Sequence, residues 1–124
     1  MKKIYINCFD QNKNKQIIDL ANELDLETAS LKYDDLKKTV KAIIENIDEE
    51  ITTIPLQYQM EEMLLFYNLN DNELNNFLQK YRQKGIQPIS LKAIVTEYNY
   101  KWSLLELIEH LKQERAYYQQ SSQK

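Results

Sequence analysis

Apolar residues follow two different spacings along this chain, and together they predict four strands that alternate with four helices. Strands are predicted where apolar or β-branched residues run together or alternate, over residues 3–9, 26–31, 60–68 and 89–96. Helices are predicted where apolar residues recur every three or four positions, over residues 13–24, 34–47, 71–84 and 104–118. This order is typical of an α/β fold built on one sheet.

Local signals mark the ends of the two later helices. Asn70 and Glu73 form a capping box at the start of the third helix, and Gly85 ends it in the left-handed conformation that glycine adopts without strain. Ser103 is the predicted N-cap of the last helix, and Trp102 is expected to fasten its start to the core. Asp34 is expected to cap the second helix. We assign Trp102, Ser103 and Gly85 structural roles.

The polarity of the strands predicts their order in the sheet. The first and third strands are almost continuously apolar, which is typical of central strands, whereas the second and fourth carry polar residues as edge strands do. With right-handed crossovers, the predicted order is 2-1-3-4. The expected fold is therefore a three-layer α/β fold with a mostly parallel, four-stranded sheet, similar to flavodoxin but shorter.

The length of 124 residues fits one domain, which we place over residues 1–118. The connector 48–59, broken by a proline, is a possible sub-boundary, and residues 119–124 are expected to form a disordered tail. No apolar run approaches the roughly 18 residues of a membrane span. We expect a cytoplasmic protein without a membrane segment.

Composition excludes several kinds of site. The single glycine excludes a glycine-rich phosphate loop, and the single cysteine, Cys8, excludes an internal disulfide. A net charge of −3 and a pI of about 5.2 disfavour binding to nucleic acid. No cofactor or metal site is predicted.

A parallel sheet of this order would bind ligands beyond the carboxyl ends of its central strands. The expected crevice lies between the first and third strands, and its polar rim comprises Cys8, Asp10, Asn12, Asn68 and Asn70. Most of these residues are suited to hydrogen bonding and not to proton transfer at neutral pH.

Two residues could carry chemistry, but neither has the partners it needs. The start of the chain up to Cys8 resembles the phosphocysteine subunits of sugar phosphotransferase systems, yet Phe9 and Asp10 replace the small, flexible loop of that family. We favour a Cys8 that packs as a small hydrophobic residue. His110 lies in no metal motif and is expected at the surface. No catalytic residue is assigned, and an enzyme is disfavoured.

The segment 88–102 resembles the family of low-GC Gram-positive bacteria known as domain of unknown function 3783. The matching positions are Leu91, Lys92, Ala93, Thr96, Asn99 and Trp102. The resemblance covers about residues 60–116 and implies no activity, because none is assigned to the family. This chain departs from the family pattern at Glu97, where proline is usual, and at Asn68, where glycine is frequent.

The roles of the matching polar residues have two interpretations. Thr96 and Asn99 can fix a turn by hydrogen bonds to their own backbone, and Lys92 can protect a sheet edge from unwanted pairing. These structural roles are the ones we favour. Alternatively, Asn68, Lys92, Thr96 and Asn99 bind a small ligand at the carboxyl edge of the sheet.

The function therefore stays open among three hypotheses. The first is a non-catalytic interaction or regulatory module with an unknown protein partner, and the alternative is a binder of a small anionic or polar metabolite. Nucleic-acid binding is the weakest, and would use four residues of the last helix: Lys112, Arg115, Tyr117 and Tyr118. Tyrosines expected at the surface would also suit a homodimer interface, namely Tyr98, Tyr100, Tyr117 and Tyr118.

Overall fold

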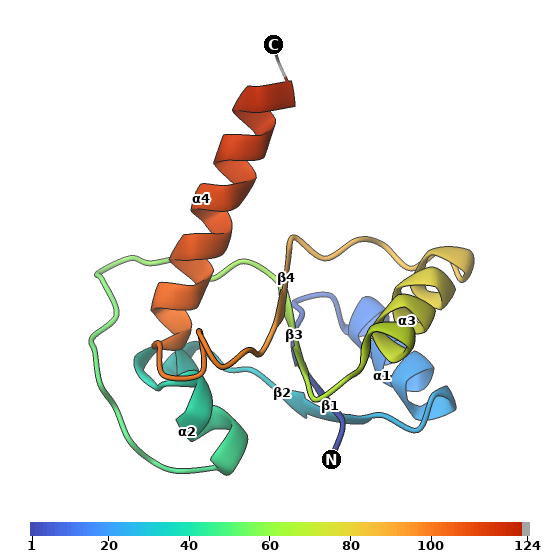
Figure 1. Cartoon of the computed structure of the whole chain (residues 1–124), viewed down its shortest axis with the longest axis horizontal. Helices are drawn as coiled ribbons and strands as arrows, with labels where there is room; N and C mark the ends of the chain where they lie inside the picture. Colours follow the sequence, from blue (N-terminus) through green and yellow to red (C-terminus); the bar gives the residue numbers. More distant parts are fainter. Residues whose placement is uncertain (123–124) are drawn as a thin grey trace. The chain divides into compact units, whose positions relative to one another are not determined.

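The computed structural model describes the backbone of residues 1–122 and the side chains of residues 1–118 (Figure 1). The four predicted strands are all present, each near its predicted position. The elements are β1 (Lys3–Asn7), α1 (Gln11–Glu23), β2 (Glu27–Ser30), the 3-10 helix η1 (Tyr33–Lys37), α2 (Val40–Glu45), β3 (Met63–Tyr67), α3 (Asp71–Gln83), β4 (Leu91–Ile94) and α4 (Leu104–Ser122).

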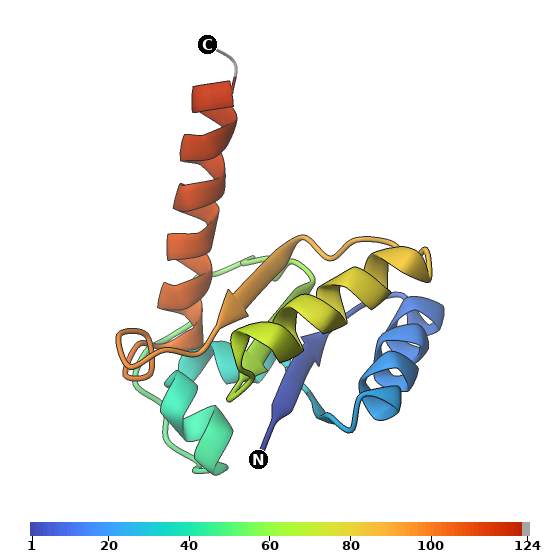
Figure 2. The ribbon, with the colours of Figure 1, turned by 45° about the vertical axis from the view of Figure 1, so that its right-hand side comes forward.

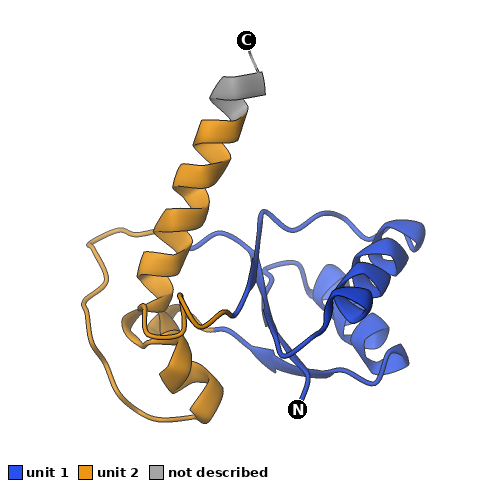
Figure 3. Cartoon of the chain, viewed as in Figure 1, with its two compact units in different colours: residues 1–31, 60–95 blue, residues 32–59, 96–124 orange. Residues whose placement is uncertain are grey.

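The chain divides into two compact units, each made of two separate segments (Figure 3). Unit 1 comprises residues 1–31 and 60–95, and it holds the whole sheet with α1 and α3. Unit 2 comprises residues 32–59 and 96–124, with η1, α2 and α4. The predicted connector 48–59 is the end of the first segment of unit 2. α4 continues through Ser122 into the predicted tail 119–124, whose residues 123–124 lie outside the described residues.

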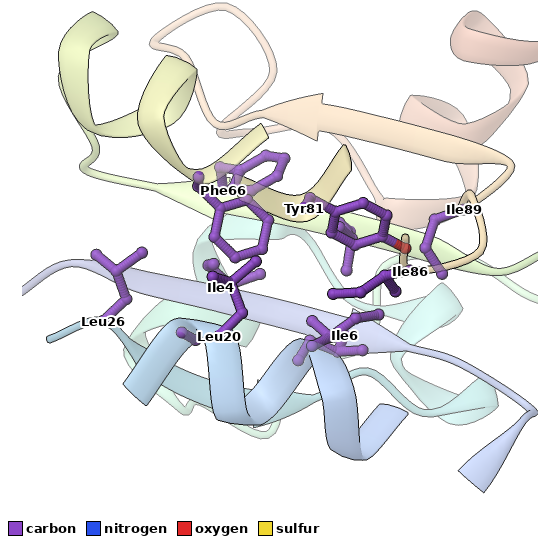
Figure 4. Packing of buried hydrophobic residues seen from close by; sticks show 12 residues of the cluster. Ile4, Ile6, Leu20, Leu26, Phe66, Tyr81, Ile86 and Ile89 are labelled. Atoms are coloured by element: carbon purple, nitrogen blue, oxygen red, sulfur yellow. The ribbon is translucent and has the colours of Figure 1, made fainter. Parts of the chain in front are cut away.

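The sheet of unit 1 is mixed, and its order β2-β1-β3-β4 confirms the predicted one. The β1–β2 and β3–β4 pairs are parallel, as predicted. The β1–β3 pair is antiparallel, with Lys3 opposite Tyr67 and Asn7 opposite Met63, so the prediction of a parallel central pair is wrong. Figures 2 and 4 show the consequence, because the arrowheads of β1 and β4 point in opposite directions.

The direction of β3 follows from the connection that precedes it. A parallel β3 would require the chain to cross back over the sheet before starting the strand. Ser30 at the end of β2 is in register with Ile6, and Met63 at the start of β3 is in register with Asn7. The connection 31–62 therefore begins and ends beside the carboxyl end of β1, so β3 runs antiparallel to β1.

One face of the sheet carries α1 and α3 and forms the main core of unit 1 (Figures 1 and 4). Alternate residues of β1, Ile4 and Ile6, point to this face, and so does Phe66 of β3. Phe66 and Phe77 of α3 are fully or almost fully buried and meet edge to face, with ring centroids 5.6 Å apart. Burial of side chains of this size contributes about 2–3 kcal/mol each.

The helix predicted over residues 34–47 is broken into η1 and α2. The backbone is extended at Lys38 and Thr39, which form isolated bridges with Glu50 and Ser103 in unit 2. The Thr39 hydroxyl then accepts a hydrogen bond from the Ala42 N–H at 2.9 Å and begins a new helix. A β-branched threonine favours this N-cap position over the interior of a helix. The predicted cap at Asp34 is also wrong, because the N-cap of η1 is Lys32.

The predicted capping residues of α3 and α4 are confirmed. Asn70 and Glu73 form a reciprocal capping box at the start of α3. Gly85 follows the end of α3 with φ +68°, the left-handed conformation expected there. The Ser103 hydroxyl accepts a hydrogen bond from the Glu106 N–H at 3.0 Å, which makes Ser103 the N-cap of α4.

Candidate functional site

The crevice predicted between β1 and β3 is not formed, because the two strands are antiparallel. Cys8 and Asp10 follow the end of β1, at the edge of the sheet where β3 begins. Asn68 and Asn70 follow the end of β3, beside the start of β1, and the Asn68 side chain donates to the Met1 carbonyl oxygen at 3.0 Å. The two sets of residues lie at opposite ends of strands that are about 13 Å long.

Where β1 ends and β3 begins, the Glu62 carboxylate accepts hydrogen bonds from three donors. Its Oε2 atom accepts from the Phe9 N–H at 2.9 Å and from the Cys8 thiol at 3.3 Å. Its Oε1 atom accepts from Lys13 Nζ at 2.5 Å, and the same ammonium group donates to the Pro88 carbonyl oxygen at 3.1 Å. We call Cys8, Lys13 and Glu62 the Glu62 cluster.

The Glu62 cluster keeps the Cys8 thiol protonated and the Glu62 carboxyl ionised at neutral pH. Burial and the hydrogen bond to Glu62 raise the pKa of the Cys8 thiol, so the thiol stays protonated. Burial alone would raise the pKa of the Glu62 carboxyl, but the bonds from Lys13, Phe9 and Cys8 outweigh it and lower that pKa. Nearby, burial raises the pKa of Tyr81 to about 12, with smaller contributions from the Cys8 thiolate that forms at high pH and from the Glu62 carboxylate.

The chemistry of the Glu62 cluster is therefore that of a structural link. A reactive cysteine needs a lowered pKa, and an adjacent carboxylate has the opposite effect. Lys13 and Glu62 are 11% and 15% exposed, and each bonds to backbone groups of a different loop. The cluster joins the β1–α1 turn to the start of β3 and to the loop before β4. Spacing could not reveal this cluster, since Cys8 and Glu62 are 54 positions apart.

Thr96 and Asn99 fix the turn that precedes α4. The Asn99 side-chain oxygen accepts from the Thr96 N–H at 2.9 Å, and the Thr96 hydroxyl oxygen accepts from the N–H groups of Tyr98 and Asn99 at 3.2 Å. Asn99 is 8% exposed. These bonds are the turn-forming role that the sequence analysis favoured, although they do not test ligand binding.

The other two predicted ligand residues, Lys92 and Asn68, lie in unit 1. Lys92 is exposed in the middle of β4, in register with Leu64, and β4 is an edge strand. Asn68 has φ +64°, so it adopts the left-handed conformation for which glycine is frequent in the resembled family. The edge position of Lys92 agrees with the structural role assigned to it above, and ligand binding by Lys92 or Asn68 stays a prediction.

The start and the end of α4 differ in burial. Leu104, Leu107 and Ile108 are buried, and the exposed His110 stacks on the Trp102 ring with centroids 4.4 Å apart. Beyond Lys112 nearly every described side chain is exposed, including Tyr117 (66%) and Tyr118 (69%). Figure 3 shows this part of α4 extending beyond the other segments of unit 2.

Tyr58 is a residue whose role the sequence analysis missed. Its hydroxyl donates to Glu109 Oε1 at 2.9 Å, and Lys112 Nζ lies 4.8 Å from the centre of its ring. This contact fastens the middle of α4 to residues of the first segment of unit 2. Lys112, one of the residues predicted to contact nucleic acid, is therefore engaged within the unit.

The β2 edge of the sheet adjoins a hollow of about 220 Å³. The inward backbone groups of β2 pair with β1, since the N–H groups of Glu27 and Leu31 donate to the carbonyl oxygens of Lys2 and Ile6. Alternation then directs the backbone groups of Thr28 and Ser30 outward. The hollow is lined by Ile6, Asn14, Ile18, Thr28, Ala29 and Ser30.

Comparison with known families supports the resemblance proposed from the sequence. Residues 62–118 match the model of a family described as domain of unknown function, DUF3783. This segment is therefore similar to the DUF3783 family over slightly less than half of the chain. The match runs from β3 to the exposed half of α4, and it agrees with the predicted span of about 60–116.

The two other comparisons and the described side chains add no further assignment. No curated protein and no solved structure matches the chain. Among the described residues, no three His, Cys, Asp or Glu side chains are grouped so that they could hold a metal ion. None of the helices in that part of the chain combines the length and apolar character needed to cross a membrane.

Proposed function

We propose that this chain is a non-catalytic interaction module that binds a protein partner through the C-terminal half of α4. The observation that carries the proposal is the exposure of Tyr117 and Tyr118 on the part of α4 that extends beyond the rest of unit 2. Tyrosine is enriched at protein interfaces, because its ring buries a large area and its hydroxyl still forms hydrogen bonds.

The energetics of α4 support a partner for this half. Short helices are marginal in water, and helices in proteins are stabilised mainly by packing an apolar face. Leu104, Leu107 and Ile108 supply that packing for the first turns, but the described residues after Lys112 bury little. A partner that covers Tyr117 and Tyr118 would supply the missing burial.

The reactive side chains elsewhere support a non-catalytic role. Burial and the hydrogen bond to the Glu62 carboxylate raise the pKa of the Cys8 thiol, which makes it a poor nucleophile at neutral pH. Thr96 and Asn99 use their polar atoms on backbone groups of their own turn. The metabolite alternative keeps Lys92 as its exposed cation, but no observation favours it over the interaction module.

Affinity capture from a native lysate tests the proposal directly. The unmodified chain serves as bait beside the double variant Tyr117→Ser/Tyr118→Ser, and captured proteins are identified by mass spectrometry. We expect at least one specific partner that the double variant no longer retains. Circular dichroism should show that both baits unfold at the same temperature, because exposed substitutions change stability by less than about 0.5 kcal/mol.

Tyr98→Ser is the matched control for this experiment. Tyr98 is 77% exposed but lies in the turn before α4. The control bait should retain the same partners as the unmodified chain. Capture of identical proteins by all three baits, or of none by any, would contradict the proposal.

Three finer expectations belong to the same proposal. We place the module in the cytoplasm, because a single cysteine leaves no internal disulfide to maintain. We keep the low-GC Gram-positive bacteria as its source, by resemblance to the family. We also retain the three-layer, flavodoxin-like arrangement, with the antiparallel β1–β3 pair as the established departure from it.

A further inference from the structure

We propose that the β2 edge of unit 1 binds an extended segment of a partner protein, which pairs with β2 as a fifth strand. This inference rests on the proposed interaction function and names a second contact, at a different place and with a different chemistry. Its basis is the coincidence of an unpaired strand edge, an adjoining hollow and local negative charge.

The backbone of β2 supplies the first argument. Thr28 and Ser30 direct their N–H and C=O groups away from β1, and among the described residues no hydrogen bond reaches those groups. Unpaired groups at the strand spacing are complementary to another extended backbone, which is how strand addition recognises peptides. The helix of a partner could not satisfy them, because its own backbone groups are already bonded internally.

The hollow beside β2 supplies the second argument. Thr28 is in register with Ile4, so its side chain points to the face of the sheet that carries α1. The hollow lies on this face, because Asn14 and Ile18 of α1 line it together with Ile6 of β1 and residues of β2. An added strand places alternate side chains on each face. The hollow, with a volume of about 220 Å³, is suited to one branched aliphatic side chain of the added strand.

Charge supplies the third argument and restricts which partner segments can bind. Asp25 and Glu27 are exposed at the start of β2, and neither forms an ion pair with another described residue. A basic residue in the partner segment, two or three positions from the aliphatic one, would meet these carboxylates. The inferred ligand is therefore an extended segment with an aliphatic residue and a nearby lysine or arginine.

The test uses a displayed library of random linear dodecapeptides, selected on the full chain. Selected peptides are synthesised, and their affinity is measured by fluorescence anisotropy. Amide hydrogen exchange, followed by NMR, reports where each peptide binds. We expect aliphatic and basic residues among the selected sequences, and new protection of the Thr28 and Ser30 amides. The Ala29 amide should be protected in the free chain already, since it faces β1.

Thr28→Pro removes the outward N–H without touching the β1 pairing, and edge strands accept proline at such positions. We expect this variant to bind at least about tenfold more weakly, because one backbone hydrogen bond is lost. Thr28→Val keeps the N–H and the branched side chain, so it should bind nearly as well as the unmodified chain. The hydrogen-exchange experiment needs no variant, so it decides the question even if Thr28→Pro does not fold.

Several outcomes would overturn the inference. One is a selection that yields no binder, and another is a bound peptide that protects amides elsewhere and leaves Thr28 and Ser30 unprotected. A third is protection of these amides that rises with protein concentration alone, since a second copy of the chain would then occupy the edge. None of these results bears on α4, because the Tyr117→Ser/Tyr118→Ser variant should bind the selected peptides unchanged.

Discussion

The Glu62 cluster and the C-terminal half of α4 use their side chains in opposite ways. In the cluster, a thiol, an ammonium group and a carboxylate bond to one another and to nearby backbone groups. On α4, two tyrosine rings remain largely exposed. Residues with reactive groups are thus found where the fold needs them, whereas residues suited to contact are left at the surface. The exposure of the side chains, and not their residue type, distinguishes the structural cluster from the proposed binding surface.

The largest expected effect on stability comes from the core of unit 1, against which Cys8 of the Glu62 cluster packs. Phe77 is fully buried between Phe66 and Tyr81, with ring centroids 5.6 and 6.0 Å away. We expect Phe77→Ala to lower the free energy of unfolding by about 3–5 kcal/mol, because it leaves a cavity. Tyr118→Ala should change it by less than about 0.5 kcal/mol. Urea titration measures both, and comparable losses would abolish the contrast.

The second prediction breaks the Glu62 cluster itself. We expect Glu62→Gln to lower the free energy of unfolding by about 1–2 kcal/mol at pH 7, since hydrogen bonds to charged groups contribute about this much. The pKa of Glu62 is lowered in the folded chain, so its carboxylate stabilises the fold above the ordinary pKa of 4.5. That stabilisation is lost as the pH falls below 4.5 through the lowered value.

The pH dependence therefore identifies the cause of the loss. Unfolding curves between pH 7 and 3 should show the unmodified chain and Glu62→Gln converging at low pH. Glu27→Gln removes the same charge from an exposed residue of unit 1 and should follow the unmodified chain throughout. A difference for Glu62→Gln that stays constant with pH would mean that packing, and not the carboxylate, is responsible.

A third, smaller effect is expected in the turn before α4. Thr96→Val removes the hydroxyl that accepts from the N–H groups of Tyr98 and Asn99, and we expect the free energy of unfolding, measured by urea titration, to fall by about 1 kcal/mol.

A thermal-shift screen with nucleotides, sugar phosphates and amino acids should give no stabilisation of the unmodified chain. A shift that disappears in Lys92→Ala would instead support the metabolite alternative.

The smallest effect concerns the reactivity of Cys8 and not the stability of the fold. Because its pKa is raised, we expect alkylation by iodoacetamide at pH 8 to be slower in the folded chain than in the urea-unfolded chain. Glu62→Gln removes the neighbouring negative charge and should accelerate the reaction in the folded state. Equal rates in the folded chain and in Glu62→Gln would show that access alone limits Cys8.

Features that depend on neighbours in the chain were predictable from the sequence. The capping box of Asn70 and Glu73, the left-handed Gly85 and the N-cap at Ser103 each involve residues at most a few positions apart. The order of the strands was predictable as well, because strands buried on both faces are apolar throughout and edge strands are not. The prediction of one helix over residues 34–47 was wrong, because pairings of Lys38 and Thr39 with distant residues interrupt the helix.

Only the tertiary structure decided the direction of β3 and with it the fate of the predicted crevice. Hydrophobic patterning indicates that a strand is buried but does not indicate its direction. The direction of β3 depends on the path of residues 31–62. The Glu62 cluster, the contact of Tyr58 with Lys112 and the hollow beside β2 join residues distant in the chain. Sequence fixes which side chains are present, and the three-dimensional path of the backbone determines which of them meet.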